Sequence, residues 1–476
     1  MLILSLILPI TFAFLLIHLL WASPQIINSQ TAIKLFLSVG LGLGISSLSY
    51  WVFLNLSGSF NSFSIILEAA VFMVLILVCA VIQLKRKPLC NINEPFQKNE
   101  KESQDILTWH KIPFLTIGFW TAILCTVVLF VTRTLNNPHG SWDAWAIWNM
   151  RARFLYRSQE HWITAFSSMH GCTHTDYPLL IPAAISRIWG YIGSDTLHAP
   201  MIVAFLFTFS TVGLIVSAMI LIKNRNHGYV TGLILLSLTF FTIHGAGQVA
   251  DVPFGFFVLS TMVLFFLKDK LPEKSAVFCF LAGMMAGLSA WTKNEGLLFI
   301  IIILFSHFIV TVFKQGRASY FKEIRPLFLG LSPVILIIAH FKMNLDISND
   351  LVSKRSAESL VKLLFDPERY LIVGKSYLYY LNKKFLAIII TFPLMLIALK
   401  LSGDKNIKVS STISALAILL LLFGYFMIYI ITPHDLAWHV KTSLSRLYLQ
   451  VMPSVVFVFF MLLNSIGRQP DYGSRK

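Results

Sequence analysis

The chain has 476 residues, of which 56% are hydrophobic and only 13% are charged, and its mean hydropathy is +0.74. Soluble domains contain about 45–50% apolar and about 25% charged residues, so this composition excludes a soluble globular fold, a disordered tail and a disulfide scaffold. The net charge of +16 does not indicate nucleic acid, because no basic run is longer than Lys-Arg-Lys at 85–87. We therefore predict an all-α, polytopic membrane protein with no nucleic-acid partner.

Apolar windows of about 17–25 residues, the length that crosses about 30 Å of hydrocarbon, recur along the whole chain. The first window begins at Met1 without a basic segment before it, so it predicts a spanning helix rather than a signal peptide. Thirteen spanning helices are predicted in total, near residues 1–21, 32–56, 63–84, 112–132, 198–222, 228–245, 251–267, 275–291, 295–313, 326–341, 385–400, 409–432 and 446–465.

The apolar stretch 178–193 is predicted to be a juxtamembrane or re-entrant helix rather than a further span. If it crossed the membrane, every later basic turn would move to the outer side, against the positive-inside rule. With thirteen crossings the basic turns lie on one side, which we expect to be cytoplasmic, together with the polar linker 85–111. Two long outer segments follow from this topology: 133–197, folded as short juxtamembrane helices, and a second outer loop at 343–384.

The linker also suggests how the chain is divided. We interpret residues 1–84 as accessory transmembrane helices and 112–342 as a transmembrane catalytic core that includes the first outer loop. Residues 385–476 are interpreted as C-terminal transmembrane helices.

Ionisable residues at a membrane edge are costly, so they are functional candidates by default. In this chain they occur in five separate segments that all fall at the predicted outer face. These residues are Asp143, His174, Asp176, Asp251, Lys293, Glu295, His434, Asp435 and Arg446. We expect Asp143, Asp251, Lys293 and Arg446 to line one shared cavity.

Each of these candidates also has a purely structural interpretation. Asp143 follows a Gly-Ser-Trp break and Asp251 precedes Val-Pro, so either carboxylate would suit a helix N-cap. Lys293 and Glu295 could form a surface ion pair in a helix–helix turn.

Three tryptophans follow the first candidate carboxylate closely. Trp142, Trp145 and Trp148 recur every three residues, so we expect them to share one helix face. Such a face is typical of an interfacial aromatic belt, and it would also provide a stacking platform for a sugar ring or a lipid.

A metal site is the weaker interpretation of the segment that holds His170, His174 and Asp176. Histidines four residues apart share a helix face, but the intervening residues are poor helix formers and no second half of a zinc motif is present. We favour an Asp-Tyr-Pro turn that starts the helix at 178–193, and we predict no metal ligands.

The pattern formed by these segments resembles the GT-C fold glycosyltransferases, and most closely their protein O-mannosyltransferase and aminoarabinose-transferase branch. Asp143 matches the acidic residue in the family's first outer loop, without the adjoining Glu of the mannosyltransferases. The segment 174–179 (HTDYPL) is similar to a family motif in which His or Asp precedes Pro-Pro-Leu, with Tyr replacing one Pro. The helix start 251–253 (DVP) and the helix end 291–293 (WTK) also match, and the likeness covers about 112–342.

The resemblance implies an inverting glycosyltransferase that moves a sugar from a polyprenyl-phosphate donor to a glycan, lipid or protein acceptor. Asp143 would be the catalytic base, and Lys293 and Arg446 would bind the donor phosphate, with Arg151 and Arg153 as weaker candidates. Substrate contacts are expected from Trp142, Trp145, His174, Asp176, Asp251, Glu295, His434 and Asp435.

The resemblance also carries expectations about cofactors, location and alternatives. No cofactor is required for a donor with one phosphate, although a divalent metal is left open. We expect a multi-pass protein of a bacterial inner membrane, with its active site on the periplasmic face. The alternatives are a polymerase or ligase of lipid-linked saccharides, or a transporter for them. A transporter should carry ionisable groups near the bilayer midplane and often shows an inverted repeat.

Overall fold

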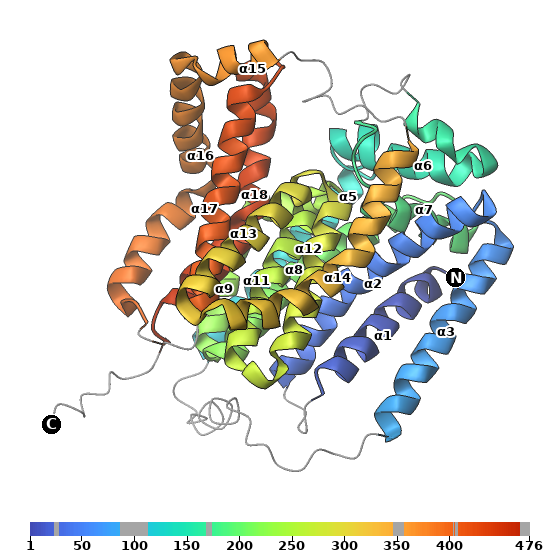
Figure 1. Ribbon diagram of the computed structural model, residues 1–476, viewed down its shortest axis with the longest axis horizontal. Helices are drawn as coiled ribbons and strands as arrows, with labels where there is room; N and C mark the ends of the chain where they lie inside the picture. Colours follow the sequence, from blue (N-terminus) through green and yellow to red (C-terminus); the bar gives the residue numbers. More distant parts are fainter. Residues whose placement is uncertain are drawn as a thin grey trace.

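The computed structural model describes most of the chain, namely residues 1–22, 28–85, 113–167, 174–345, 357–402, 404 and 408–466. Nearly all of this part is helical, and its β-structure is limited to one bridge between Leu401 and Leu463. Figure 1 shows a bundle in which α8, α11 and α12 lie in the middle and the remaining helices surround them.

Twelve of the described helices are long and apolar enough to cross a membrane. They are α1 (Leu2–Leu20), α2 (Asn28–Ser57), α3 (Ser62–Lys85), α5 (Pro113–Asn136), α8 (His198–Ile222), α11 (Asp251–Lys270), α12 (Ser275–Thr292), α13 (Glu295–Gln315), α14 (Arg317–Asn344), α16 (Pro367–Leu399), α17 (Lys408–Ile431) and α18 (Leu436–Leu462). The pair α9 (Arg225–Ser237) and α10 (Thr239–Ala246) is bent by 67° and forms a thirteenth, broken span if it is counted as one. The predicted all-α polytopic fold with about thirteen spans is confirmed.

The helix α7 (Leu180–Ile192) occupies the apolar stretch that we predicted not to cross. Its 13 residues make it about 20 Å long, well short of the hydrocarbon thickness. Together with η1 (Ala144–Trp148), α6 (Asn149–Arg157) and η2 (Gln159–Phe166), it forms the short helices that were predicted for the segment 133–197. Figure 1 places α6 and α7 together at one end of the bundle, which we call the α6–α7 end.

The centre of the bundle is α11, whose membrane-spanning window is entirely buried. It packs against α8, α12, α17 and α18, so its apolar residues on every face are covered by other helices. The neighbouring α12 and α14 cross at glycines, which let two backbones approach closely. A Cβ at Gly283 would lie only 2.0 Å from the Leu327 carbonyl oxygen, and one at Gly330 only 1.9 Å from that of Phe280.

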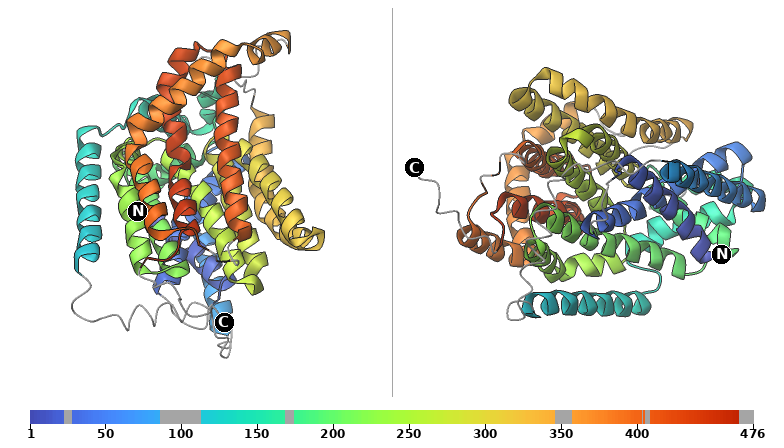
Figure 2. Two further views of the ribbon diagram at one scale, coloured as in Figure 1. Left: turned by 90° about the vertical axis from the view of Figure 1, so that its left-hand side faces the viewer. Right: turned by 90° about the horizontal axis from the view of Figure 1, so that it is seen from below.

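Two of the three N-terminal helices, α1 and α2, contribute to this core, whereas α3 lies outside it and packs mainly against α1. Helix α2 packs against α1, α7 and α8, and Gly40 lies against the Phe256 ring of α11. The Tyr50 hydroxyl of α2 lies 2.6 Å from the Ser186 hydroxyl of α7. By contrast, α5 lies along the edge of the bundle, where its main neighbours are α9 and α10 (Figure 2).

The predicted second outer loop at 343–384 is wrong in its secondary structure. Most of that segment is helix, in α15 (Ala357–Leu364) and in the first half of α16, which begins at Pro367 and not near 385. The start of α16 is specified locally, because Asp366 accepts a hydrogen bond from the Glu368 amide at 3.0 Å and Pro367 occupies the first turn. The predicted span at 385–400 matches only the second half of α16, because the first half carries several cations and is not apolar enough, and Phe385 marks the kink in the helix.

The basic turns that we predicted to share one side contact one another. Lys223 donates to the Leu463 carbonyl at 2.8 Å, and Lys270 pairs with Asp404 at 2.8 Å. Lys314 donates to the Thr412 hydroxyl at 2.6 Å. These contacts join turns that are up to 240 residues apart in the chain, as the predicted alternation of helices requires.

Candidate functional site

The first residue of α11, Asp251, lies at the centre of a buried network of charges. Its Oδ1 accepts hydrogen bonds from Lys293 Nζ at 3.0 Å and from Gln450 Nε2 at 2.7 Å, and its Oδ2 accepts one from Arg446 Nε at 2.9 Å. The N-cap position of α11 is occupied by Ala250, and Asp251 is the first residue inside the helix, so the alternative of an N-cap is wrong for Asp251. A fully buried carboxylate needs charged partners of this kind, and the positive end of the helix dipole adds to them.

Arg446 connects this buried carboxylate to the surface. Its Nη2 lies 2.6 Å from Asp143 Oδ2, while its Nε is held by Asp251. The predicted span 446–465 puts Arg446 at the start of a helix, but α18 begins at Leu436. The earlier start arises because the Asp435 carboxylate caps the helix and accepts from the Trp438 amide at 2.7 Å.

Lys293 lies in the break between α12 and α13 and is 3% exposed, so it does not form a surface pair. Its ammonium contacts Asp251 and also Glu295 Oε1 at 2.8 Å. Burial by itself would lower the pKa of Lys293, but the two carboxylates outweigh it and raise the pKa. The second oxygen of Glu295, Oε2, is buried and has no hydrogen-bond partner within the described residues.

Asp143, Asp251, Lys293, Glu295 and Arg446 therefore form one connected set, which we call the five-residue network. The structure brings together the four residues that were expected to share a site. Four different stretches of the chain contribute to the set, and α11 supplies the buried centre.

Asp143 is the exposed end of the five-residue network. Its side chain is 19% exposed and does not cap the helix that follows it. Oδ2 is paired with Arg446, whereas Oδ1 has no hydrogen-bond partner in the part of the chain that the structure describes. A carboxylate that is fixed through one oxygen and open at the other can accept a proton from a bound molecule.

The predicted common face of the three tryptophans is wrong for one of them. Trp142 and Trp145 are about half exposed and lie edge to face, with ring centroids 5.9 Å apart, whereas Trp148 is completely buried. The cause is the π-helical turn η1, in which the Asn149 amide bonds to the Ala144 carbonyl five residues back. This wider turn rotates Trp148 away from its neighbours and onto Tyr177, where the two rings stack at 5.4 Å.

The turn at 174–177 adjoins the five-residue network. Asp176 Oδ2 accepts from Asn294 Nδ2 at 2.6 Å, and the Asn294 Oδ1 accepts from Lys342 Nζ at 3.0 Å. Tyr177 lies beneath Lys293, whose ammonium is 5.9 Å from the ring centroid. His174 stacks on Tyr177, with ring centroids 5.2 Å apart.

Arg151, predicted as a weak phosphate ligand, holds this turn in place. It is buried and donates to the carbonyl oxygens of His174 at 2.7 Å and Tyr177 at 2.9 Å. Burial lowers its pKa to about 10, and the nearby Asp176 carboxylate opposes that shift, so the guanidinium keeps its charge at neutral pH. His170 lies outside the described residues, among which no group of metal-binding side chains occurs.

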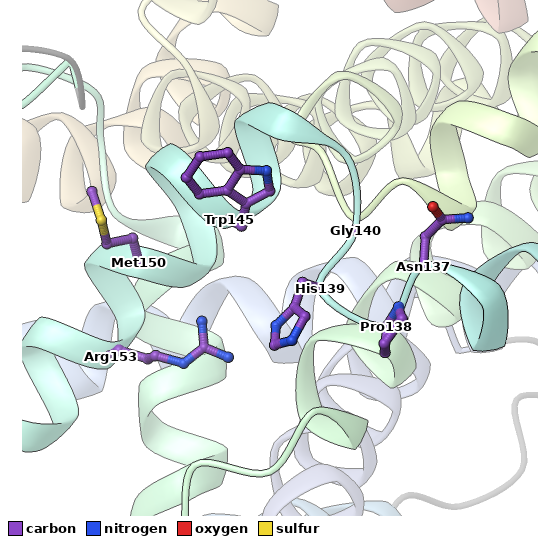
Figure 3. Close-up of a pocket in the computed structure, with 7 residues that line it drawn as sticks. All are labelled: Asn137, Pro138, His139, Gly140, Trp145, Met150 and Arg153. Carbon is purple, nitrogen blue, oxygen red and sulfur yellow. The ribbon is translucent and has the colours of Figure 1, made fainter.

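Arg153 and Trp145 line a separate, open pocket of about 620 Å³. Figure 3 shows the Arg153 guanidinium and the His139 ring facing each other across it, with Trp145 and Met150 above. Arg153 is also 3.5 Å from Asp195. No residue of the five-residue network lines this pocket, so Arg153, a predicted phosphate ligand, and Trp145, a predicted substrate contact, line a hollow outside the network.

His434 and Asp435 are exposed and lie outside the five-residue network. Asp435 caps α18, and the His434 ring packs against those of Trp438 and His439. Their contacts explain the helix start and do not connect them to Asp143.

Sequence reasoning missed several residues that complete the arrangement. Gln450 donates to Asp251 and accepts from the Tyr425 hydroxyl at 2.8 Å, and Asn294 and Lys342 tie the 174–177 turn to α13 and α14. A single glutamine in the apolar run of α18 was the one visible signal, since a polar side chain inside the membrane needs a partner.

Comparison of the chain with protein-family models, with curated proteins and with solved structures finds no match. No related protein therefore indicates a function, and the five-residue network is the feature from which a function can be inferred.

Proposed function

We propose that this protein is a membrane glycosyltransferase that moves a sugar from a polyprenyl-phosphate donor to an acceptor hydroxyl. The observation that carries the proposal is the open oxygen of Asp143, fixed at the membrane edge by Arg446. The resemblance to GT-C enzymes described above motivates the choice of donor.

In this proposal Asp143 Oδ1 removes the proton from the acceptor hydroxyl as its oxygen attacks the anomeric carbon. The bond from that carbon to the donor phosphate oxygen breaks, and the electron pair leaves with the lipid phosphate. A single displacement of this kind inverts the anomeric carbon and needs only one carboxylate. The same chemistry at the same face would serve a polymerase or ligase of lipid-linked saccharides.

Arg446 is the cation that we assign to the leaving phosphate. Two of its guanidinium nitrogens are held by Asp143 and Asp251, while Nη1 has no partner among the described residues and can donate to a phosphate oxygen. Lys293 is enclosed between two carboxylates, so we assign it a positioning role: it holds Asp251, which in turn holds Arg446.

The test uses purified protein in lipid nanodiscs with polyprenyl-phosphate mannose, N-acetylglucosamine or aminoarabinose, and measures release of polyprenyl phosphate. Asp143→Asn should reduce turnover by at least about 100-fold, because it removes the basic oxygen but keeps the size of the side chain. Asp366→Asn is the matched control, since Asp366 is a helix cap remote from the five-residue network and Asn caps equally well.

Lys293→Ala should weaken use of the donor, and Lys293→Arg should restore part of it because the charge returns. Near-normal turnover of Asp143→Asn at saturating donor and acceptor would place the acid–base group elsewhere, and Asp176 would be tested next. Absence of lipid phosphate release with every donor, while the same preparation moves a lipid-linked saccharide between leaflets, would favour the transporter instead.

A further inference from the structure

A second pocket lies between the turn that joins α2 to α3 and the short helices α6, η2 and α7. Its volume is about 380 Å³, within the range of sites that hold small organic ligands. It is separate from the five-residue network, because none of the network residues lines it. The N-terminal helices therefore meet the first outer segment around a hollow.

The inner wall of this pocket carries two buried hydroxyl groups. The Tyr50 and Ser186 hydroxyls meet there at 2.6 Å, and both side chains are almost completely buried. Gly190 lies beside the Phe60 ring, and a Cβ at this position would be only 3.0 Å from the ring. Glycine is thus what allows an aromatic ring to pack directly onto α7 and line the pocket.

The rim carries polar groups with unused hydrogen-bonding capacity. Ser62, Tyr156 and Gln159 line the pocket, and within the described residues their side-chain polar atoms have no hydrogen-bond partner. Gln159 also has a φ of +44°, a left-handed conformation that is strained for a residue with a side chain. Backbone strain of this kind is concentrated at ligand sites.

The lining has little net charge. Among the described residues that line it there is no carboxylate and one cation, Arg157, which is neutralised by Asp195, with Nε 3.1 Å from Oδ2. A pocket with hydroxyls, amides and aromatic rings but no free charge suits a neutral ligand that both donates and accepts hydrogen bonds. Sugars fit this description, because their hydroxyls do both and their C–H faces pack on aromatic rings.

We propose that this pocket binds a neutral saccharide of one or two residues. Binding here does not depend on the transfer reaction proposed above, and it can be measured without turnover. If the transfer reaction also occurs, the pocket would hold part of the acceptor glycan close to the same end of the bundle.

The experiment is saturation-transfer NMR on the full-length protein in detergent micelles, with mannose, galactose, N-acetylglucosamine and their disaccharides as probes. At least one of these should bind saturably, whereas inorganic phosphate should neither bind nor compete. Gln159→Ala removes the side-chain amide but still places a residue with a Cβ in the left-handed conformation. It should weaken binding by about three- to tenfold. Ser62→Trp should fill the mouth of the pocket and abolish binding.

Glu160→Ala is the matched control, because Glu160 is the exposed neighbour of Gln159 and does not line the pocket. Asp143→Asn should also bind normally, which separates this proposal from the proposed function. Failure of every saccharide to bind the natural protein would overturn the proposal, as would saccharide binding that survives Ser62→Trp. Competition by phosphate would identify an anion site instead.

Discussion

A buried ion pair and the five-residue network, both at the α6–α7 end, differ in whether all of their carboxylate oxygens are occupied. Glu68 of α3 and Arg187 of α7 are each 1% exposed, and both carboxylate oxygens of Glu68 are occupied, by Arg187 and by the hydroxyls of Ser49 and Tyr191. The five-residue network is equally buried at Asp251 but ends at Asp143, which is partly exposed and has one oxygen without a partner among the residues that the structure describes.

The difference shows how burial alone fails to identify a functional site. A closed ion pair can only fasten elements together, and the Glu68 pair fastens α3 to α7, where Arg187 also donates to the Ser5 carbonyl of α1 at 2.6 Å. A network with an open acceptor can in addition act on a bound molecule. Substitutions in the two sets should therefore separate loss of stability from loss of activity.

The largest effect on stability is expected at the closed pair. Glu68→Gln leaves the Arg187 charge buried without a counter-ion, so the free energy of unfolding should fall by about 3–5 kcal/mol. Unfolding of the purified protein in mixed micelles measures this change. The double variant Glu68→Gln/Arg187→Met should recover part of the loss, and a single-variant loss below about 1 kcal/mol would contradict the assignment.

Lys293→Ala should have an intermediate effect. It removes one of the three donors to Asp251, while Arg446 and Gln450 remain, so the free energy of unfolding should fall by about 1–3 kcal/mol. The same unfolding measurement applies, with Lys293→Arg as the variant that keeps the charge. Stability equal to that of the natural protein would mean that Asp251 does not need this donor.

Asp143→Asn should have a small effect on stability and a large effect on activity, the opposite of what is expected for Glu68→Gln. The pair with Arg446 is partly exposed, so the free energy of unfolding should change by less than about 1 kcal/mol. Turnover should nevertheless fall by the factor of at least about 100 given above. Unfolding and lipid phosphate release are measured on one preparation, and a loss of stability as large as that of Glu68→Gln would make Asp143 a structural residue.

The smallest effect is expected for an exposed pair at the same end. Arg157 is 63% exposed where it pairs with Asp195, so Arg157→Ala should change the free energy of unfolding by no more than about 0.5 kcal/mol. A larger change, measured in the same mixed micelles, would show that even the solvated ion pairs of this end hold the short helices in place.

The sequence by itself determined the class of fold and the side on which polar residues gather. Apolar windows report how each segment partitions into hydrocarbon, a property of the segment alone, and they located each spanning helix but not the polar first parts of α14, α16 and α18. Alternation of the helices is sufficient to place Asp143, Asp251, Lys293 and Arg446 at one end of the bundle.

Only the tertiary structure decided which of these groups pair and which are free. Arg446 lies 195 residues from Asp251 in the chain, and whether its guanidinium reaches one carboxylate or two depends on how α18 packs against α11. The same holds for Trp148, which a π-helical turn rotates into the interior, and for Arg151, which backbone carbonyls of a distant turn engage. Whether a segment enters the membrane depends on the composition of that segment alone. Which charged side chains pair depends on the distances between helices, and no single segment contains that information.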